Sequence, residues 1–244
     1  MTKRYWFQRL TLVCAFALLA PALAAAQIVR VSRSEPRNAI GFNIGYFVLR
    51  GVESRVNDDV LLADLTELAF EVDDFNYVTF GGEWLYAVSD YLEVGAGLGY
   101  YQRGVPTVYR HFQNADGTEI AQELKLRVVP ITATLRFLPI GRRNVVEPYV
   151  GAGIGVFNWH YSEVGEFVDF SDNSIFPARF TADGNAIGPV VLAGLRAPIG
   201  DIWAVGGEIR WQRAEGDTSE ERGLLGTKID LGGWTTSFTV HLRF

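Results

Sequence analysis

The last sixteen residues, 229–244, read IDLGGWTTSFTVHLRF, and this stretch decides the fold. From Trp234 onward, one set of alternate positions reads Trp, Thr, Phe, Val, Leu, Phe, and the other reads Thr, Ser, Thr, His, Arg. A period of two residues is typical of a β-strand, whose successive side chains point to opposite faces. Strands in soluble sheets average about 5 to 6 residues, whereas a strand that crosses a bilayer needs about 9 to 11. The stretch therefore predicts a membrane-spanning strand.

The same alternation recurs along the chain after residue 37. We expect eight strands, at Ala39–Val48, Asn76–Val88, Tyr91–Tyr101, Leu124–Phe137, Glu147–Asn158, Ile187–Ala197, Ile202–Arg213 and Ile229–Phe244. Short links (89–90, 138–146 and 198–201) alternate with long polar links (49–75, 102–123, 159–186 and 214–228). Short turns on one side and long loops on the other are typical of outer-membrane barrels. The sequence predicts an all-β fold, an eight-stranded antiparallel up-and-down transmembrane β-barrel over residues 39–244.

Charged residues decide which face of each strand points inward. Arginines stand on the polar faces of four strands, and a cation facing hydrocarbon is costly. We therefore expect the polar set to line the lumen and the apolar set to face lipid. A soluble lipocalin-like barrel, the alternative, would place the apolar set inside. The expected lumen charges are Glu83, Glu93, Glu147, Glu208, Arg136, Arg196, Arg210 and Arg243.

These acids and bases are equal in number, which predicts pairing across a narrow lumen and an occluded polar core. By strand position, Arg136, Arg196 and Arg243 are expected low in the barrel, near Glu93 and Glu147. The other three charges, Glu83, Glu208 and Arg210, are expected nearer the middle.

Tryptophans fall near the ends of the predicted strands. Trp203 and Trp211 share one face eight residues apart, and Trp84 and Trp234 also stand at strand ends. Aromatic residues at both edges of an apolar band form the girdles of membrane barrels. We expect these four tryptophans to form such girdles.

The first 26 residues predict a removable signal peptide. Lys3, Arg4 and Arg9 precede an apolar run, and three alanines end at Ala26. Residues 27–38 would then be an N-terminal periplasmic segment. The single cysteine, Cys14, would leave with the signal peptide, so the mature chain would contain no thiol.

The mature protein is expected to begin at or near Gln27, because small residues at the end of the alanine run are what signal peptidase reads. N-terminal sequencing of protein recovered from outer membranes tests this. A retained Met1 would contradict it.

Composition excludes several classes. The net charge is −6, so the basic footprint of a nucleic-acid-binding protein is absent. Beyond the N-terminus no run of 18 apolar residues occurs, which excludes a helical membrane protein. The histidines, His111, His160 and His241, are scattered, the first two in predicted long loops, and the acidic loops lack a twelve-residue calcium spacing. We expect no catalytic, cofactor-binding or metal-binding residues.

The first long link permits two structures. Leu61, Leu62, Leu65 and Leu68 form a helical stripe after an aspartate, but the alternation of the second strand could also extend back through 68–72. Either structure would bury apolar surface near the barrel mouth.

Residues 148–155 (PYVGAGIG), 129–136 (VPITATLR) and the terminal Phe244 resemble the small eight-stranded outer-membrane barrel superfamily of OmpA/OmpX-like and OmpW-like proteins. The resemblance implies a Gram-negative outer membrane, no cofactor, and assembly-machinery insertion through the strand that ends at Phe244. Outer-membrane lipid and lipopolysaccharide are its expected partners, and we expect a monomer.

A non-enzymatic envelope-structural, adhesive or surface-binding role with an occluded lumen follows as the expected function. One alternative is passage of small hydrophobic solutes, as thought of OmpW-like relatives, which would require an apolar upper funnel with a lateral opening. Another alternative is a barrel enzyme that modifies lipid A, which would require a His/Ser pair on a lipid-facing strand.

Overall fold

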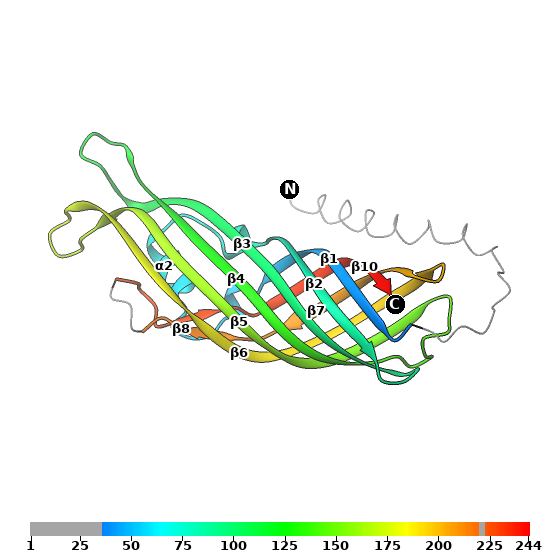
Figure 1. Ribbon diagram of the computed structural model, residues 1–244. Coiled ribbons are helices and arrows are strands. Elements are labelled where there is room, and N and C mark those ends of the chain that lie inside the picture. Colours follow the sequence, from blue (N-terminus) through cyan, green and yellow to red (C-terminus); the bar gives the residue numbers. More distant parts are fainter. Residues whose placement is uncertain (1–35, 220–222) are drawn as a thin grey trace. The chain divides into compact units, whose positions relative to one another are not determined.

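The computed structural model describes residues 36–219 and 223–244, so the expected signal peptide lies outside the described residues. Eight antiparallel strands close into a barrel in the order β1-β10-β7-β6-β5-β4-β3-β2 (Figure 1). They are β1 (Asn38–Leu49), β2 (Tyr77–Ala87), β3 (Leu92–Gln113), β4 (Glu119–Phe137), β5 (Glu147–Val168), β6 (Ile175–Ile199), β7 (Trp203–Gln212) and β10 (Gly233–Arg243). Pairing of β1 with β10 closes the ring, which confirms the predicted eight-stranded fold.

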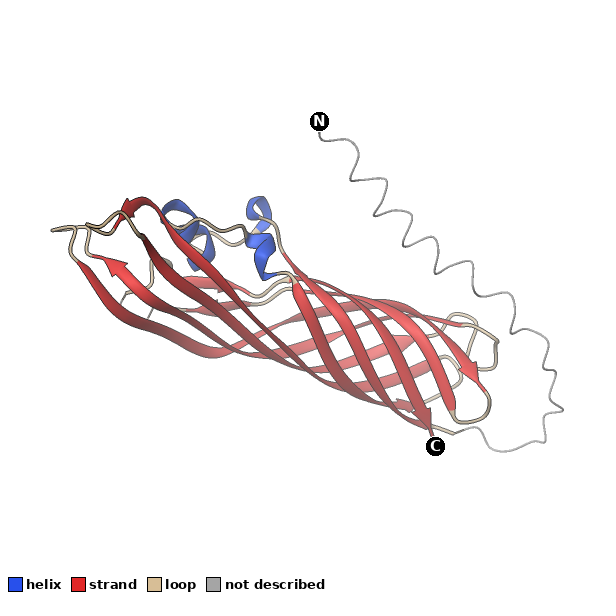
Figure 2. Ribbon diagram, turned by 90° about the horizontal axis from the view of Figure 1, so that it is seen from above, coloured by secondary structure: helices blue, strands red, loops and turns tan. Residues whose placement is uncertain are grey.

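Four strands are much longer than predicted. Strands β3 to β6 have 22, 19, 22 and 25 residues, against 10 to 12 in the other four. The predicted loops 102–123 and 159–186 are therefore mostly paired strand, as the register from Trp159↔Gly184 to Val168↔Ile175 shows. Figure 2 shows these strands continuing past the ring, at the end away from the C-terminus. The sequence did not predict these extensions because their outward side chains are polar. A strand above the membrane meets water on its outer face, so the apolar alternation of a membrane-spanning strand is absent there.

The first long link is helical, with 3-10 turns on either side. Helix α2 (Val60–Glu67) follows η2 (Val52–Ser54) and precedes η3 (Val72–Phe75). Asp59 caps α2 by accepting a hydrogen bond from the Leu61 N–H. The strand alternative survives only as an isolated bridge between Leu68 and Tyr109.

The last predicted strand begins later than expected. Residues Lys228–Asp230 form β9, which pairs with β8 (Glu215–Asp217) in a separate two-stranded sheet. Strand β10 starts after that, at Gly233. Alternation alone could not mark this boundary, because both strands carry it.

The outer surface of the ring is apolar. Phe42, Ile209 and Phe238 are 66%, 51% and 53% exposed, although large apolar side chains normally avoid water. The strands thus present apolar residues outward and polar residues inward, as the sequence predicts. Within the described residues, no helix is long and apolar enough to cross a membrane.

The four tryptophans predicted as girdles all lie on this outer face. Trp84, Trp203 and Trp234 are exposed and Trp211 is half-buried. Trp211 stands opposite Trp234 across the β7–β10 pair, while Trp203 stands opposite Leu242 at the other end. Their girdle role remains a proposal, as does the role of Phe244 in assembly.

Candidate functional site

The lower lumen holds a buried cluster of acids and arginines. Arg196 on β6 donates from Nη2 to Glu93 Oε1 at 2.8 Å and from Nε to Glu147 Oε2 at 2.9 Å. Arg243 on β10 also donates to Glu147. Arg142, from the turn after β4, forms a 3.1 Å ion pair with Glu93. Four strands and the turn after β4 are therefore tied together through two carboxylates.

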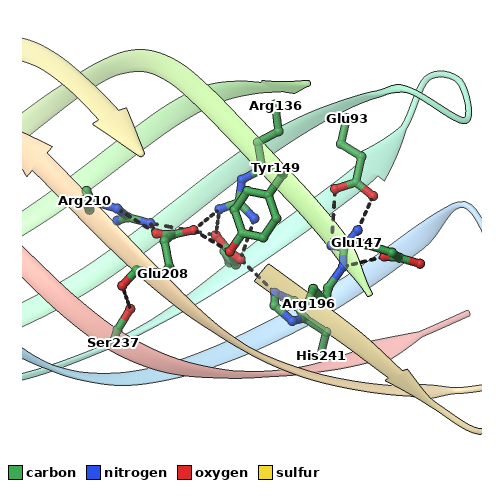
Figure 3. A network of polar contacts seen from close by, with 10 residues as sticks. Glu93, Arg136, Glu147, Tyr149, Arg196, Glu208, Arg210, Ser237 and His241 are labelled. Carbon is green, nitrogen blue, oxygen red and sulfur yellow. Dashed lines mark hydrogen bonds and ion pairs between the residues drawn. The ribbon is translucent and has the colours of Figure 1, made fainter. Parts of the chain in front are cut away.

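A second cluster lies next to it. Arg136 on β4 binds Glu83 Oε1 at 3.0 Å and Glu208 Oε2 at 3.1 Å (Figure 3). Arg210 Nη2 donates to Glu208 Oε1 at 2.8 Å, and His241 Nε2 lies 2.9 Å from Glu83 Oε1. Each acid has at least two partners, as a carboxylate removed from water requires.

One lumen residue departs from its predicted partners. The sequence predicts Arg136 low in the barrel, near Glu93 and Glu147, and Arg136 does stand opposite Glu93 in the β3–β4 register. Its guanidinium instead reaches Glu83 and Glu208, lying 5.0 Å from the ring centroid of Tyr149. Glu93 already binds two other arginines, so the long side chain of Arg136 turns toward the unmatched acids. The position of an arginine on its strand fixes its Cα, but it does not fix where the guanidinium group lies.

Three members of these clusters were not predicted: His241, Tyr149 and Arg142. Tyr149 donates to Glu208 Oε2 at 3.1 Å. Glycines directly opposite on the neighbouring strands leave room for the rings, because a Cβ at Gly41 would lie 2.6 Å from His241, and one at Gly194 would lie 2.4 Å from Tyr149. Glycine opposite an inward ring is thus a signal that sequence reasoning could have used.

Little space remains beside these clusters. A void of about 40 Å³ lies next to Arg210, and Asn43, Thr79, Gln212 and Thr235 are among its lining residues. A cavity needs about 10 to 15 Å³ to hold one water, so this void accommodates only a few.

The upper end of the barrel is filled by an apolar plug, which consists of α2, the adjoining turns and the inward faces of the extended strands. Its fully buried members include Val60, Leu61, Phe75, Ile120, Leu124, Leu126 and Phe157. The first link therefore folds down into the mouth and buries its apolar residues there.

An acid pair lies within this plug, above the membrane-spanning part. Asp64 on α2 accepts a hydrogen bond of 2.8 Å from the Tyr161 hydroxyl on β5. Burial raises the pKa of Asp64, and burial together with the nearby Asp64 charge raises the pKa of Glu163. The same desolvation raises the pKa of Tyr161. The pair is therefore most stable in the plug when protonated.

Opening of α2 is expected to become easier as pH rises. An exposed carboxyl loses its proton near pH 4, whereas the buried pair retains protons to higher pH, so rising pH stabilises only the open form. For each proton that the closed form retains and the open form loses, the equilibrium constant for opening of α2 rises by up to about tenfold per pH unit. Amide protection of α2, corrected for intrinsic exchange and measured from pH 5 to pH 8, should fall.

The matched control is the double variant Asp64→Asn, Glu163→Gln, in which protection of α2 should no longer depend on pH. Equal protection at both ends of the range in the unmodified protein would contradict the role assigned to the pair.

The remaining histidines lie on strands. His111 and His160, predicted in loops, lie on β3 and β5. Within residues 36–219 and 223–244, no group of three His, Cys, Asp or Glu side chains could hold a metal ion. Asp59, from one of the acidic runs, instead caps α2 and pairs with Arg55 at 2.8 Å.

Comparison with known proteins gives a family and several solved structures. The family model described as outer membrane protein beta-barrel domain matches residues 11–244. No curated protein matches the chain. The Pseudomonas aeruginosa OprF N-terminal barrel has 11% identity over 86% of this chain and 100% of that one, with a TM-score of 0.43. Yersinia pestis Ail, the attachment invasion locus protein, has 12% identity over 86% and 100%, with a TM-score of 0.46. Escherichia coli outer membrane protein W has 18% identity over 87% and 100%, with a TM-score of 0.44.

Proposed function

We propose that this chain, which belongs to the family of outer membrane protein β-barrel domains, acts in the bacterial outer membrane as a closed, non-enzymatic barrel that binds a partner at the cell surface. The observation that carries the proposal is that two layers of the chain's own side chains fill its interior. Two charged clusters fill the lumen, and the apolar plug fills the mouth above them. A barrel of eight strands is just wide enough for its own side chains, and the two layers of described side chains support a lumen closed to solute.

The extended ends of β3 to β6 supply the surface for binding. At their far end, Phe170 and Phe176 are 53% and 39% exposed, and their rings contact Phe112 and Phe167. Exposed aromatic side chains on a rigid scaffold are typical of binding surfaces. The paired extensions of β3 to β6 hold these aromatic side chains well beyond the eight-stranded part of the barrel. This arrangement supports an adhesive or surface-binding role.

One observation favours the alternative function, passage of hydrophobic solutes: the upper end of the barrel, where the apolar plug lies, is lined by apolar residues. The upper end is nevertheless packed with the residues of the plug, of which Leu61, Leu124 and Phe157 have no exposed surface. Passage would require α2 to leave the mouth. The His241–Glu83 contact does not favour the enzyme alternative, because it is buried in the lumen.

A strain lacking this protein, complemented with two versions, separates the three functions. One version is unmodified, and the other joins Glu163 directly to Phe180 by a short turn, which preserves their register. We expect the shortened barrel to fold, as judged by slower gel migration before than after boiling, and to lose attachment to glycan-coated surfaces. Uptake of a hydrophobic solute and the mass spectrum of lipid A should be the same in all strains. Attachment that persists without residues 164–179 would contradict the binding role, and a changed lipid A mass would favour the enzyme.

A further inference from the structure

The outer face of β4 changes from apolar to basic where the strand leaves the apolar band. Lys125 and Arg127 are half-buried on this strand. They alternate with Leu124, Leu126 and Val128, all of which are buried in the interior. Because successive side chains of a strand point to opposite faces, the two cations point outward.

These cations lie at the depth of the lipid headgroups. Ile131, which is 55% exposed, belongs to the apolar band, and the half-buried Val129 follows it toward the extended end of the barrel. Arg127 stands one outward position beyond Val129, about 7 Å along the strand and about 5 Å along the barrel axis. The headgroup layer on each side of the hydrocarbon core is about 5 to 8 Å thick. The guanidinium of Arg127 therefore lies within this layer, and Lys125 reaches it with its flexible stem.

Neighbouring strands add hydrogen-bond donors beside the two cations. Gln102 on β3 and His160 on β5 stand directly opposite Arg127, one on either side, and residues in such pairs share a face of the sheet. Gln102 Oε1 accepts from the Tyr100 hydroxyl at 2.7 Å, so the amide N–H groups of Gln102 are left for another acceptor. His160 has no hydrogen-bond partner among the described residues. We call Gln102, Lys125, Arg127 and His160 the basic patch.

No carboxylate neutralises the basic patch within the described part of the chain. Neither Arg127 nor Lys125 forms a hydrogen bond or an ion pair with another described residue. Glu123 shares the outer face of β4, but its carboxylate lies beside Gly104, where a Cβ would be 2.6 Å from Oε1. Asp183, on β6, is two strands away from Arg127. Both cations are therefore available to an external anion.

The basic patch and the apolar band below it together select the chemistry of the ligand. A guanidinium and an ammonium group favour an anion with several acceptor oxygens, as a phosphate group has. Below the patch, Leu98, Ile131 and Val156 stand side by side in register and are all exposed. Apolar side chains on the outer face of a membrane barrel contact acyl chains. A phosphate joined to acyl chains satisfies both surfaces, whereas a free anion satisfies only the first.

We propose that the basic patch binds the phosphate group of a lipid in the outer leaflet, whose acyl chains lie against the apolar band. This inference goes beyond the surface-binding function, because it concerns the membrane side of the extended strands. A lipid held there fixes the depth of β4, and with it the height at which the far ends of β3 to β6 stand.

The test compares two lipids that differ only in phosphate. Refolded protein in maltoside micelles, which contain no phosphate, is titrated with diphosphorylated lipid A and with the same lipid A after removal of its phosphates. Native mass spectrometry counts the bound lipids and gives both dissociation constants. The phosphorylated lipid should bind about 25-fold more tightly, because each of the two cations contributes about fivefold near a lipid surface. The ring resonances of His160, assigned with His160→Gln, should shift with the phosphorylated lipid alone.

Matched variants locate the preference. In Arg127→Gln with Lys125→Gln, the two lipids should bind with nearly equal affinity. Arg127→Lys with Lys125→Arg keeps both charges and should keep the preference. Arg179→Gln is the control, because Arg179 lies on the outer face of β6 about 20 Å farther from the membrane than Ile187 of the apolar band. Its removal should leave both dissociation constants unchanged.

Three results would overturn the site. They are equal affinity of the unmodified protein for the two lipids, a preference that persists in the double glutamine variant, and loss of the preference in millimolar inorganic phosphate, which would indicate a site for free anions. Slower gel migration before than after boiling checks that each variant is folded. The site is independent of the closed interior, since a conducting barrel that prefers the phosphorylated lipid contradicts the closed interior alone.

Discussion

Arg136→Ala is expected to destabilise the barrel by about 3 to 5 kcal/mol, the cost of breaking a buried charge pair from one side. Arg136 is fully buried and holds both Glu83 and Glu208. Without it the two carboxylates lose their shared cation inside a lumen that water can hardly enter. A urea titration of the refolded protein in lipid vesicles, followed by tryptophan fluorescence, measures the change.

The partner of Arg136 can be identified by rescue. Glu83→Gln removes one of the uncompensated charges and should restore part of the stability, whereas Glu93→Gln should not, because Glu93 binds Arg196 and Arg142. Arg143→Ala is the control, since its ion pair with Asp90 is exposed and worth at most about 1 kcal/mol. Equal stability of Arg136→Ala and the unmodified protein would mean that the charged cluster does not hold the lumen together.

Ile209→Arg is expected to cost about 2 to 4 kcal/mol, because a cation in the middle of β7 would face hydrocarbon. Ile209 lies on the outer face, between Trp203 and Trp211 in sequence, and it is half exposed in the isolated barrel. If water surrounded this face, an exposed arginine would cost little. The free energy of unfolding in vesicles distinguishes the two environments.

Val145→Arg is the matched control. Val145 is 80% exposed in the turn between β4 and β5, outside the apolar band, so a cation there remains in water. We expect its effect to be within about 0.5 kcal/mol. Comparable losses in both variants would contradict the assignment of the outer face to lipid.

The transmembrane part of the fold could be predicted because a bilayer imposes a simple rule. Each spanning strand alternates between lipid and lumen, so Phe238 and Val240 alternate with Thr239 and His241. Above the membrane that rule weakens, since both water and protein accept polar residues. His160 and Ser162, which were predicted in a loop, are therefore paired strand in β5, opposite Arg127 and Lys125 of the predicted strand.

The lumen charges could be predicted as a set but not pair by pair. Sequence alternation places Arg136 and Arg196 inside, yet each is long enough to reach acids on several strands. The plug was predicted only as buried apolar surface, because both the helical stripe of 61–68 and the strand alternation of 68–72 satisfy the sequence. Tertiary packing against Leu124 and Phe157 selects the helix.

Single-channel conductance of the refolded mature protein in a planar bilayer tests the closed interior most directly. The clusters around Arg136 and Arg196 and the apolar plug above them predict negligible conductance, with or without an apolar solute. A large, stable, ohmic conductance from the unmodified protein would contradict this account and favour passage through the barrel.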